Sequence, residues 1–292
     1  MATERNRMTP RRWVREIAWR HAVLLLAVFF SLFPVVWVVS SAFNPIDTLS
    51  ATSLIPEGVT TDNFTELFSD PNFPFGKWMW NTWKISLIAS SLNVFVAALA
   101  AYAFSRLKFK GRRVGLLTLL LLQVFPQFLG FIALFLMGQQ IGDIVPALGL
   151  GTHAYLILVY LGGAIGYNAF LIKGFMDTVP RSLDESATVD GATPWQVFQK
   201  VVFPLARPVL AVIFIITFIN TYSEYILART LLRSTDQFTL ALGLQLFVTS
   251  DYAAKWGAMS AAALLGAGPI VLTFLIAQKQ IIGGLTQGAV KG

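Results

Sequence analysis

The sequence contains no cysteine, which excludes disulfide bonds and thiolate metal sites. Charged residues are scarce as well: Asp, Glu, Lys and Arg make up 13% of the 292 residues, whereas soluble domains carry about 25%. The two histidines, His21 and His153, are too few and too isolated to suggest a histidine metal centre. Apolar residues, in contrast, account for 55% of the chain, a composition typical of an integral membrane protein.

Motifs for nucleotide binding and catalysis are also missing. The sequence has no G-x-x-x-x-G-K-[ST] phosphate loop, because its one Gly-Lys pair, Gly76–Lys77, has Pro71 where the first glycine would stand. The apolar segments carry no HExxH motif, no paired aspartates and no Ser/His/Asp set. These absences argue against an intramembrane enzyme and leave any ATP to be handled by another polypeptide.

Six apolar stretches are long enough to cross about 30 Å of hydrocarbon as helices, the conformation that satisfies backbone groups without water. Within a few residues at each end, they are Trp19–Ala42, Ile85–Ser105, Val114–Met137, His153–Ile172, Val209–Ala228 and Trp256–Gln278. The sequence therefore predicts an all-α integral membrane protein with six transmembrane helices. A cleaved signal peptide is an alternative for the first stretch, but its apolar core is longer than the usual 7–15 residues or so and favours a retained helix.

Basic residues are distributed unevenly between the loops. The first 20 residues contain six arginines, and the loop 106–113 is also basic, whereas the loops 44–83 and 139–152 are poor in Lys and Arg. Since basic loops remain in the cytoplasm, this pattern places both termini and the segment Lys173–Arg207 there. The third outer loop, with Arg229, Arg233 and Lys255, departs from the pattern.

Small residues, proline and tryptophan predict finer features of the spans. The alanines between positions 97 and 101 allow close helix packing. Pro126 is expected to kink the third span. Trp78, Trp80 and Trp83 are typical of an aromatic belt at the outer interface.

The segment between the fourth and fifth spans interrupts the apolar pattern. Ser182, followed three residues later by Glu185, predicts a capping box at the start of a short helix. Gly191, directly after Asp190, predicts a left-handed residue that ends this helix.

A second helix start follows immediately. Thr193, Pro194 and Gln196 have the residue types preferred at the N-cap, N1 and N3 positions. The two short helices form a rigid helix–turn–helix bracket joined to spans four and five. Such an element either serves a partner protein or is only a well-capped connector.

Residue types and spacing in this bracket resemble a known motif. Glu185-Ser-Ala187-x3-Gly191-x9-Val201-x-Phe203-Pro204 is similar to the EAA loop, E-A-A-x3-G-x9-I-x-L-P, of membrane subunits of ABC importers. It departs from the motif mildly, at Ser186, Val201 and Phe203. The stretches AAYAFSRLKFKG, DGATPWQVF and GGLTQGAVKG further resemble the smaller, MalG-type permease subunit of maltose/maltodextrin importers. This likeness runs from about Asn81 to the end of the chain.

The resemblance implies a type I ABC importer fold with a cytoplasmic coupling helix between spans four and five. It divides the chain into a basic cytoplasmic tail (1–20), a six-helix permease domain (21–282) that includes the EAA loop (176–206), and a cytoplasmic C-terminal tail (283–292). The residues that it assigns to ATPase coupling are Glu185, Ala187, Asp190, Gly191, Ala192 and Trp195. It further implies that Gly288, Val290 and Lys291 contact the ATPase subunits, and that Thr249, Ser250, Asp251 and Tyr252 approach the binding protein.

The partners implied are a sister permease of the MalF type, a dimer of ATPase subunits of the MalK type and an extracytoplasmic sugar-binding protein. The chain is also expected to lie in the lipid bilayer of the bacterial inner membrane and to bind no nucleic acid. The chain itself is expected to hold no cofactor and no metal and to be no enzyme, since ATP and Mg are bound by the ATPase subunits. The implied cargo is maltose, maltodextrin or a related α-glucoside such as trehalose.

Polar residues near the outer end of the fifth span form a candidate translocation path. Asn220, Tyr222 and Glu224 lie toward one side of a helix, and their groups suit a ligand rich in hydroxyls. Because an ionised side chain at the centre of a bilayer costs about 2.5–3.5 kcal/mol, Glu224 is expected to face a polar cavity, a partner or the outer interface. The alternative is a structural carboxylate paired with Arg229 or a neighbouring helix.

A stand-alone secondary transporter or channel is the alternative function from another class. It predicts intramembrane acid–base groups or inverted internal repeats. One glutamate inside the spans and the lack of an evident repeat give it little support.

Overall fold

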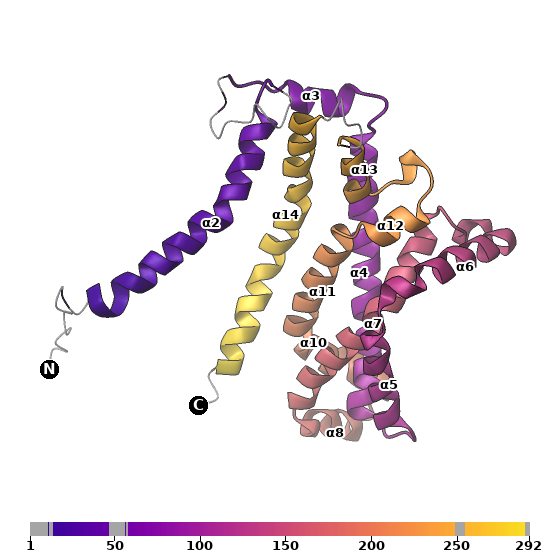
Figure 1. Ribbon diagram of the computed structural model, residues 1–292. Coiled ribbons are helices and arrows are strands. Elements are labelled where there is room, and N and C mark those ends of the chain that lie inside the picture. The colour runs from indigo at the N-terminus through magenta and orange to yellow at the C-terminus, as the bar shows by residue number, and fades with distance from the viewer. Residues whose placement is uncertain (1–10, 12–13, 47–55, 57, 249–254, 290–292) are drawn as a thin grey trace. The chain divides into compact units, whose positions relative to one another are not determined.

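The computed structural model describes residues 11, 14–46, 56, 58–248 and 255–289, which form helices and turns with no strand among them (Figure 1). The chain divides into two compact units, Met1–Ser69 with Phe247–Leu265 and Asp70–Leu246 with Gly266–Gly292. The long helix α14 (Trp256–Ala289) contributes to both.

Helices of membrane-spanning length and composition agree with the predicted fold class. Among the described residues four qualify alone: Val14–Ala42, Phe75–Arg106, Gln127–Ile144 and Trp256–Ile276. Two bent helix pairs bring the number to six if each pair is one span, namely His153–Gly163 with Ile165–Thr178, bent by 50°, and Pro194–Leu205 with Arg207–Tyr222, bent by 76°.

The first unit contains α2 (Trp19–Ala42) and α3 (Asp62–Ser69). α2 has the predicted bounds, and its apolar side chains are exposed along most of its length, as expected for a helix that faces lipid. Asn63 of α3 is buried, and its Nδ2 donates hydrogen bonds to the carbonyls of Ala42 (3.0 Å) and Asn44 (2.9 Å). A Cβ on Gly257 of α14 would lie 2.6 Å from this amide, so the glycine allows α14 to approach Asn63.

The second unit is built around α4 (Phe75–Arg106), α7 (His153–Thr178) and α11 (Arg207–Tyr222). Besides its part of α14 and several short 3-10 and π-helical segments, it contains the α-helices α5 (Arg112–Val124), α6 (Phe131–Ile144), α8 (Arg181–Val189), α9 (Pro194–Val197), α10 (Phe203–Leu205), α12 (Ile226–Leu231) and α13 (Leu240–Leu246). α8 lies at one end of α4 and α13 at the other (Figure 1).

Close packing of small side chains forms the core of the second unit. Ala97, Ala98 and Ala101 of α4 are completely buried beside residues of α7 and α11, as the sequence predicts. The core also holds a buried polar group: Asn168 Nδ2 of α7 donates to Asn93 Oδ1 of α4 (2.6 Å) and to Thr217 Oγ1 of α11 (3.2 Å). The three helices are therefore joined by hydrogen bonds as well as by packing.

The third predicted span, Val114–Met137, is not one kinked helix. It consists of α5, a 3-10 turn (Gln127–Gly130) and α6. The break falls at Pro126, which has no N–H to continue the helix and holds Phe125 in an extended conformation (φ −67°, ψ 130°). The fifth predicted span, Val209–Ala228, is similarly divided, since α11 ends at Tyr222 and α12 begins at Ile226.

Trp78 does not belong to an exposed aromatic belt, in contrast to the prediction. Its side chain is fully buried, and its Nε1 donates to the carbonyl of Thr235 (2.8 Å). The loop before α13 folds back over α4 and supplies this acceptor, which satisfies the indole N–H away from water. Trp80, in contrast, is 58% exposed and fits the prediction.

The contact between Trp78 and α13 generates a stability prediction. A Cβ on Gly243 of α13 would lie 2.2 Å from the Trp78 ring, so Gly243→Ala is expected to lower the free energy of unfolding by about 1–3 kcal/mol. Gly76→Ala is the matched control, because a Cβ there meets nothing within 4 Å. Thermal unfolding of the detergent-purified protein, followed by tryptophan fluorescence, compares the two. A midpoint for Gly243→Ala at or above that of Gly76→Ala contradicts the buried contact.

Candidate functional site

The bracket predicted between the fourth and fifth spans consists of α8, a turn at Gly191, α9 and the π-helical segment Phe198–Val202 that continues α9. The turn closes through backbone hydrogen bonds from Gly191 N to Thr188 O (3.0 Å) and from Ala192 N to Ala187 O (2.9 Å). Gly191 has φ +83°, a left-handed conformation that costs glycine little. The predicted end of the first helix is therefore confirmed.

The two helix starts differ from each other. At α9 the predicted cap is present: Thr193 Oγ1 accepts from Gln196 N (3.3 Å), and Gln196 Oε1 accepts from Thr193 N (2.8 Å). At α8 the predicted capping box of Ser182 and Glu185 is wrong, because the helix already begins at Arg181, with Pro180 at the N-cap position and no side-chain cap. Pro180 supplies the non-helical conformation that an N-cap needs (φ −57°, ψ 131°), so Ser182 falls inside the first turn.

The predicted coupling residues separate into two groups by exposure. Glu185, Asp190, Gly191 and Trp195 are exposed, whereas Ala187 and Ala192 are half-buried against the core. Val189, which the sequence analysis did not single out, is 87% exposed at the end of α8, and Trp195 is 53% exposed. The bracket thus presents large apolar side chains among polar ones, a combination typical of a protein-binding surface.

The opposite face of the bracket is buried. Val197, Phe198 and Val202 belong to the same core cluster as the alanines of α4. The Phe198 ring lies 5.1 Å from that of Tyr102 and 5.4 Å from that of Trp195, measured between centroids. The exposed Trp195 therefore packs on the buried ring of Phe198. Through these aromatic contacts the bracket is held on the helix bundle.

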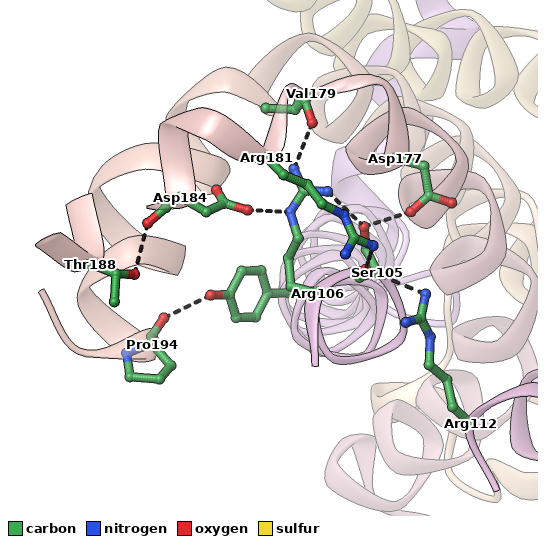
Figure 2. Close-up of polar contacts among 10 residues, drawn as sticks. Ser105, Arg106, Arg112, Asp177, Val179, Arg181, Asp184, Thr188 and Pro194 are labelled. Atoms are coloured by element: carbon green, nitrogen blue, oxygen red, sulfur yellow. Dashed lines mark hydrogen bonds and ion pairs between the residues drawn. The ribbon is translucent and has the colours of Figure 1, made fainter. Parts of the chain in front are cut away.

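Polar contacts link the end of α4 to the bracket and to the end of α7 (Figure 2). Arg106 Nε lies 2.6 Å from Asp184 Oδ2, and Arg106 Nη2 donates to the carbonyl of Val179 (2.9 Å). Tyr102 OH donates to the carbonyl of Pro194 (3.0 Å), and Ser105 Oγ donates to Asp177 Oδ1 (2.6 Å). From the sequence, Arg106 is predicted only to help orient the chain, as one of the basic residues of the loop 106–113. Its position in the stretch AAYAFSRLKFKG, which carries the family resemblance, was the one indication of a further role.

Two residues of the candidate translocation path line one cavity. Asn220 and Glu224 face a cavity of about 860 Å³ that is also lined by parts of α5, α6 and α7. Tyr222 does not line it: the side chain is buried, and its OH donates to the carbonyl of Gly266 (2.8 Å). The structure therefore brings Asn220 and Glu224 together and separates Tyr222 from them.

Glu224 is held by three donors. Its Oε1 accepts from Leu227 N (2.7 Å), and its Oε2 accepts from Ala228 N (3.0 Å) and from Tyr160 OH of α7 (2.7 Å). The carboxylate caps the N-terminus of α12 and attaches it to a neighbouring helix. It therefore has a structural role in addition to its place at the cavity.

Other polar residues of the cavity were not predicted as a site. Gln123, Gln127 and Asn168 line it together with Thr217 and Tyr160. The two glutamines flank the α5–α6 break, where the sequence analysis considered only a kink at Pro126. Their common location depends on how α5, α7 and α11 pack, and no local pattern carries that information.

Some predicted residues cannot be placed. Thr249, Ser250, Asp251 and Tyr252, expected near a binding protein, lie outside the described residues, as do Val290 and Lys291 of the tail. Gly288 lies in α14, which continues as a helix to Ala289, well into the predicted tail. Within the described part of the chain, no group of three His, Asp or Glu residues is arranged to hold a metal ion.

Comparisons with known proteins agree with this architecture. The family model described as "Binding-protein-dependent transport system inner membrane component" matches residues 93–282. The maltose/maltodextrin transport system permease protein MalG of Escherichia coli (strain K12) is 38% identical over 284 residues, which cover 93% of this chain and 95% of MalG. The galactooligosaccharides transport system permease protein GanQ of Bacillus subtilis (strain 168) is 37% identical over 286 residues, which cover 98% and 99% of the two chains.

A crystal structure supports the fold. A chain of a bacterial ABC transporter involved in the import of the acidic polysaccharide alginate superposes with a TM-score of 0.72 at 22% identity, over 92% of this chain and 97% of that chain. The predicted all-helical type I importer fold is confirmed by this match and by the family model. The chain belongs to the binding-protein-dependent transport system inner membrane component family and is a non-catalytic, multi-pass permease subunit of an ABC importer in the inner membrane.

Proposed function

We propose that this chain is one of two permease subunits of an importer for oligosaccharides of the maltose and maltodextrin type, trehalose being a related candidate. The observation that carries this proposal is the 38% identity to a maltose/maltodextrin permease along almost the whole length of both chains. The galactooligosaccharide permease is nearly as similar, at 37%, so oligosaccharides are the substrate class common to these relatives. Within that class, the α-glucosides are the proposed cargo.

The proposed partners follow from the division of labour in the family. ATP and Mg bind to a separate dimer of MalK-type ATPase subunits, since this chain has no phosphate loop. A MalF-type sister permease completes the path, and an extracytoplasmic binding protein delivers the sugar. An alginate transporter has been crystallised in complex with its oligosaccharide-bound periplasmic protein, which supports such a delivery step here.

The bracket is the proposed contact with the ATPase. Its exposed residues, including Glu185, Gly191 and Trp195, would be seated on the ATPase subunit at the cytoplasmic face, with both chain termini on that side. Closure of the ATPase dimer would displace the bracket and with it α7 and α11, to which the chain joins it.

The free energy that the ATPase must supply follows from the populations of the two states. To shift the ratio of outward-open to inward-open importer from 1:99 to 99:1, the ATPase must favour the outward-open state by about 5.5 kcal/mol. A rigid bracket can transmit this free-energy difference to the helices joined to it, whereas a flexible loop would only change its own conformation.

Substitution of Gly191 tests the proposed ATPase contact. Gly191→Leu adds a bulky side chain in open space, with nothing within 4 Å of its Cβ, so we expect normal membrane insertion. Uptake of maltodextrin per ATP hydrolysed should fall about tenfold, within the usual range of allosteric coupling. Transport and ATPase assays on reconstituted importer measure this ratio.

Gly111→Leu is the matched control for Gly191→Leu. Gly111 has the same φ of +83° and equally open surroundings, but it lies between α4 and α5, outside the bracket. Both variants therefore carry a similar backbone strain of about 1–2 kcal/mol. Normal uptake by Gly191→Leu, or an equal loss in both variants, contradicts the docking role.

The cavity predicts different effects at Asn220 and Glu224. Asn220→Ala removes an amide that faces the cavity, so uptake is expected to fall about 2- to 10-fold, the equivalent of one hydrogen bond, at an unchanged level of importer. Glu224→Ala removes the acceptor of three hydrogen bonds and should lower the amount of importer as well as uptake. Immunoblots and sugar uptake in the same cells separate the two effects. Unchanged uptake by Asn220→Ala excludes it from the path.

A further inference from the structure

We propose that Arg106 is a positioning residue that ties the bracket to α4, so that α4 moves together with the bracket. This inference rests on the proposed function, because the bracket must be moved by an ATPase for the link to matter. The chain itself joins the bracket to α7 through Val179–Pro180 and to α11 through α10. α4 has no such covalent connection and can follow the bracket only through contacts between side chains and backbone.

Arg106 contacts the bracket and the connection that leads into it from α7. Its Nε lies 2.6 Å from Asp184 Oδ2 in the first turn of α8, and its Nη2 donates to the carbonyl of Val179 (2.9 Å), 73 residues away along the chain. Figure 2 shows the guanidinium between these two partners. A single side chain at the end of α4 thus holds both α8 and the residue that leads into it.

The ion pair is largely shielded from solvent. The side chains of Arg106 and Asp184 are 6% and 17% exposed. Exposed ion pairs contribute only about 0–1 kcal/mol because water and salt screen them. Loss of one partner from a largely buried pair, in contrast, leaves a poorly solvated charge without its counter-charge, so removing either residue is costly.

Neighbouring contacts of α4 extend the link to the second bracket helix and to α7. Tyr102, one helical turn before Arg106, donates its OH to the carbonyl of Pro194 at the start of α9 (3.0 Å). Ser105 donates to Asp177 near the end of α7 (2.6 Å). The last turn of α4 therefore holds α7, α8 and α9 at once, and a displacement of the bracket displaces this turn.

A nearby ion pair provides a matched control. Lys173 and Asp177 lie 2.5 Å apart, four residues from each other within α7. Because both residues belong to one helix, their pairing cannot transmit motion between elements. Lys173→Gln removes a charge at the same end of the bundle and leaves the link between α4 and the bracket intact.

Distance measurements on the full-length chain test the link itself. The chain has no native cysteine, so spin labels at Val96→Cys on α4 and Ser182→Cys on α8 report their separation without background. Pulsed electron paramagnetic resonance in nanodiscs should give a narrow distance distribution for the parent and for Lys173→Gln, and a broad one for Asp184→Asn. An unchanged distribution in Asp184→Asn overturns the proposal. This readout needs no partner subunit, so it stands even if the proposed sugar or ATPase is wrong.

Transport assays test the consequence of the link. In reconstituted importer, Asp184→Asn and Arg106→Gln should each lower sugar transported per ATP about tenfold, and Lys173→Gln should not. The double variant should lose no more than either single variant, because both substitutions remove the same contact. It also leaves no unpaired buried charge, which keeps the test valid if a single variant assembles poorly. Additive losses would show that Arg106 and Asp184 do not act through one contact, and a normal ratio despite a broadened distance would overturn the role of this link in transport.

Discussion

The close approach of α4 to α7 and α11 is the constraint on which the second unit depends. It is possible because the facing side chains of α4 are alanines with no exposed surface. Larger side chains at these positions would push the helices apart and break the buried hydrogen bonds among Asn93, Asn168 and Thr217. The same packing continues into the bracket, whose buried residues extend the core cluster beyond the end of the bundle. The exposed face of the bracket is rigid because its buried face is part of this core.

Two kinds of connection meet at the bracket. The backbone continues from α7 into α8 and from α10 into α11, so these helices follow the bracket by covalent continuity. α4 is joined by charge and hydrogen bonding instead, through Arg106 and Tyr102. A permease subunit receives its energy from outside the membrane, and this arrangement distributes a local displacement over three helices at once.

Features that depend on local sequence were predictable. The bounds of α2, the start of α7 at His153 and the capping box at Thr193 agree with the sequence because hydropathy and capping chemistry are properties of a few adjacent residues. The family motif likewise identified the bracket from residue types and spacing alone. These signals were sufficient for the fold class and for the position of the proposed coupling element.

Features that depend on tertiary partners were not predictable in the same way. Trp78 is buried because a distant loop covers it, and Tyr222 leaves the cavity because its OH finds a carbonyl on α14. As a basic residue in a basic loop, Arg106 indicates only the orientation of the chain in the membrane. Only the packed structure shows Asp184 beside it. The start of α8 was mispredicted for a local reason instead, because Pro180 supplies the N-cap conformation two residues before Ser182. Apart from this helix start, the competing interaction came from a distant part of the chain.

The amide–hydroxyl cluster of Asn93, Asn168 and Thr217 has a mechanical consequence for a transporter. Sliding α4, α7 or α11 against one another would strand these groups in a medium without water, where an unsatisfied polar group costs several kcal/mol. The three helices consequently resist shear at the level of this cluster, one part of the bundle away from the bracket contacts at the end of α4.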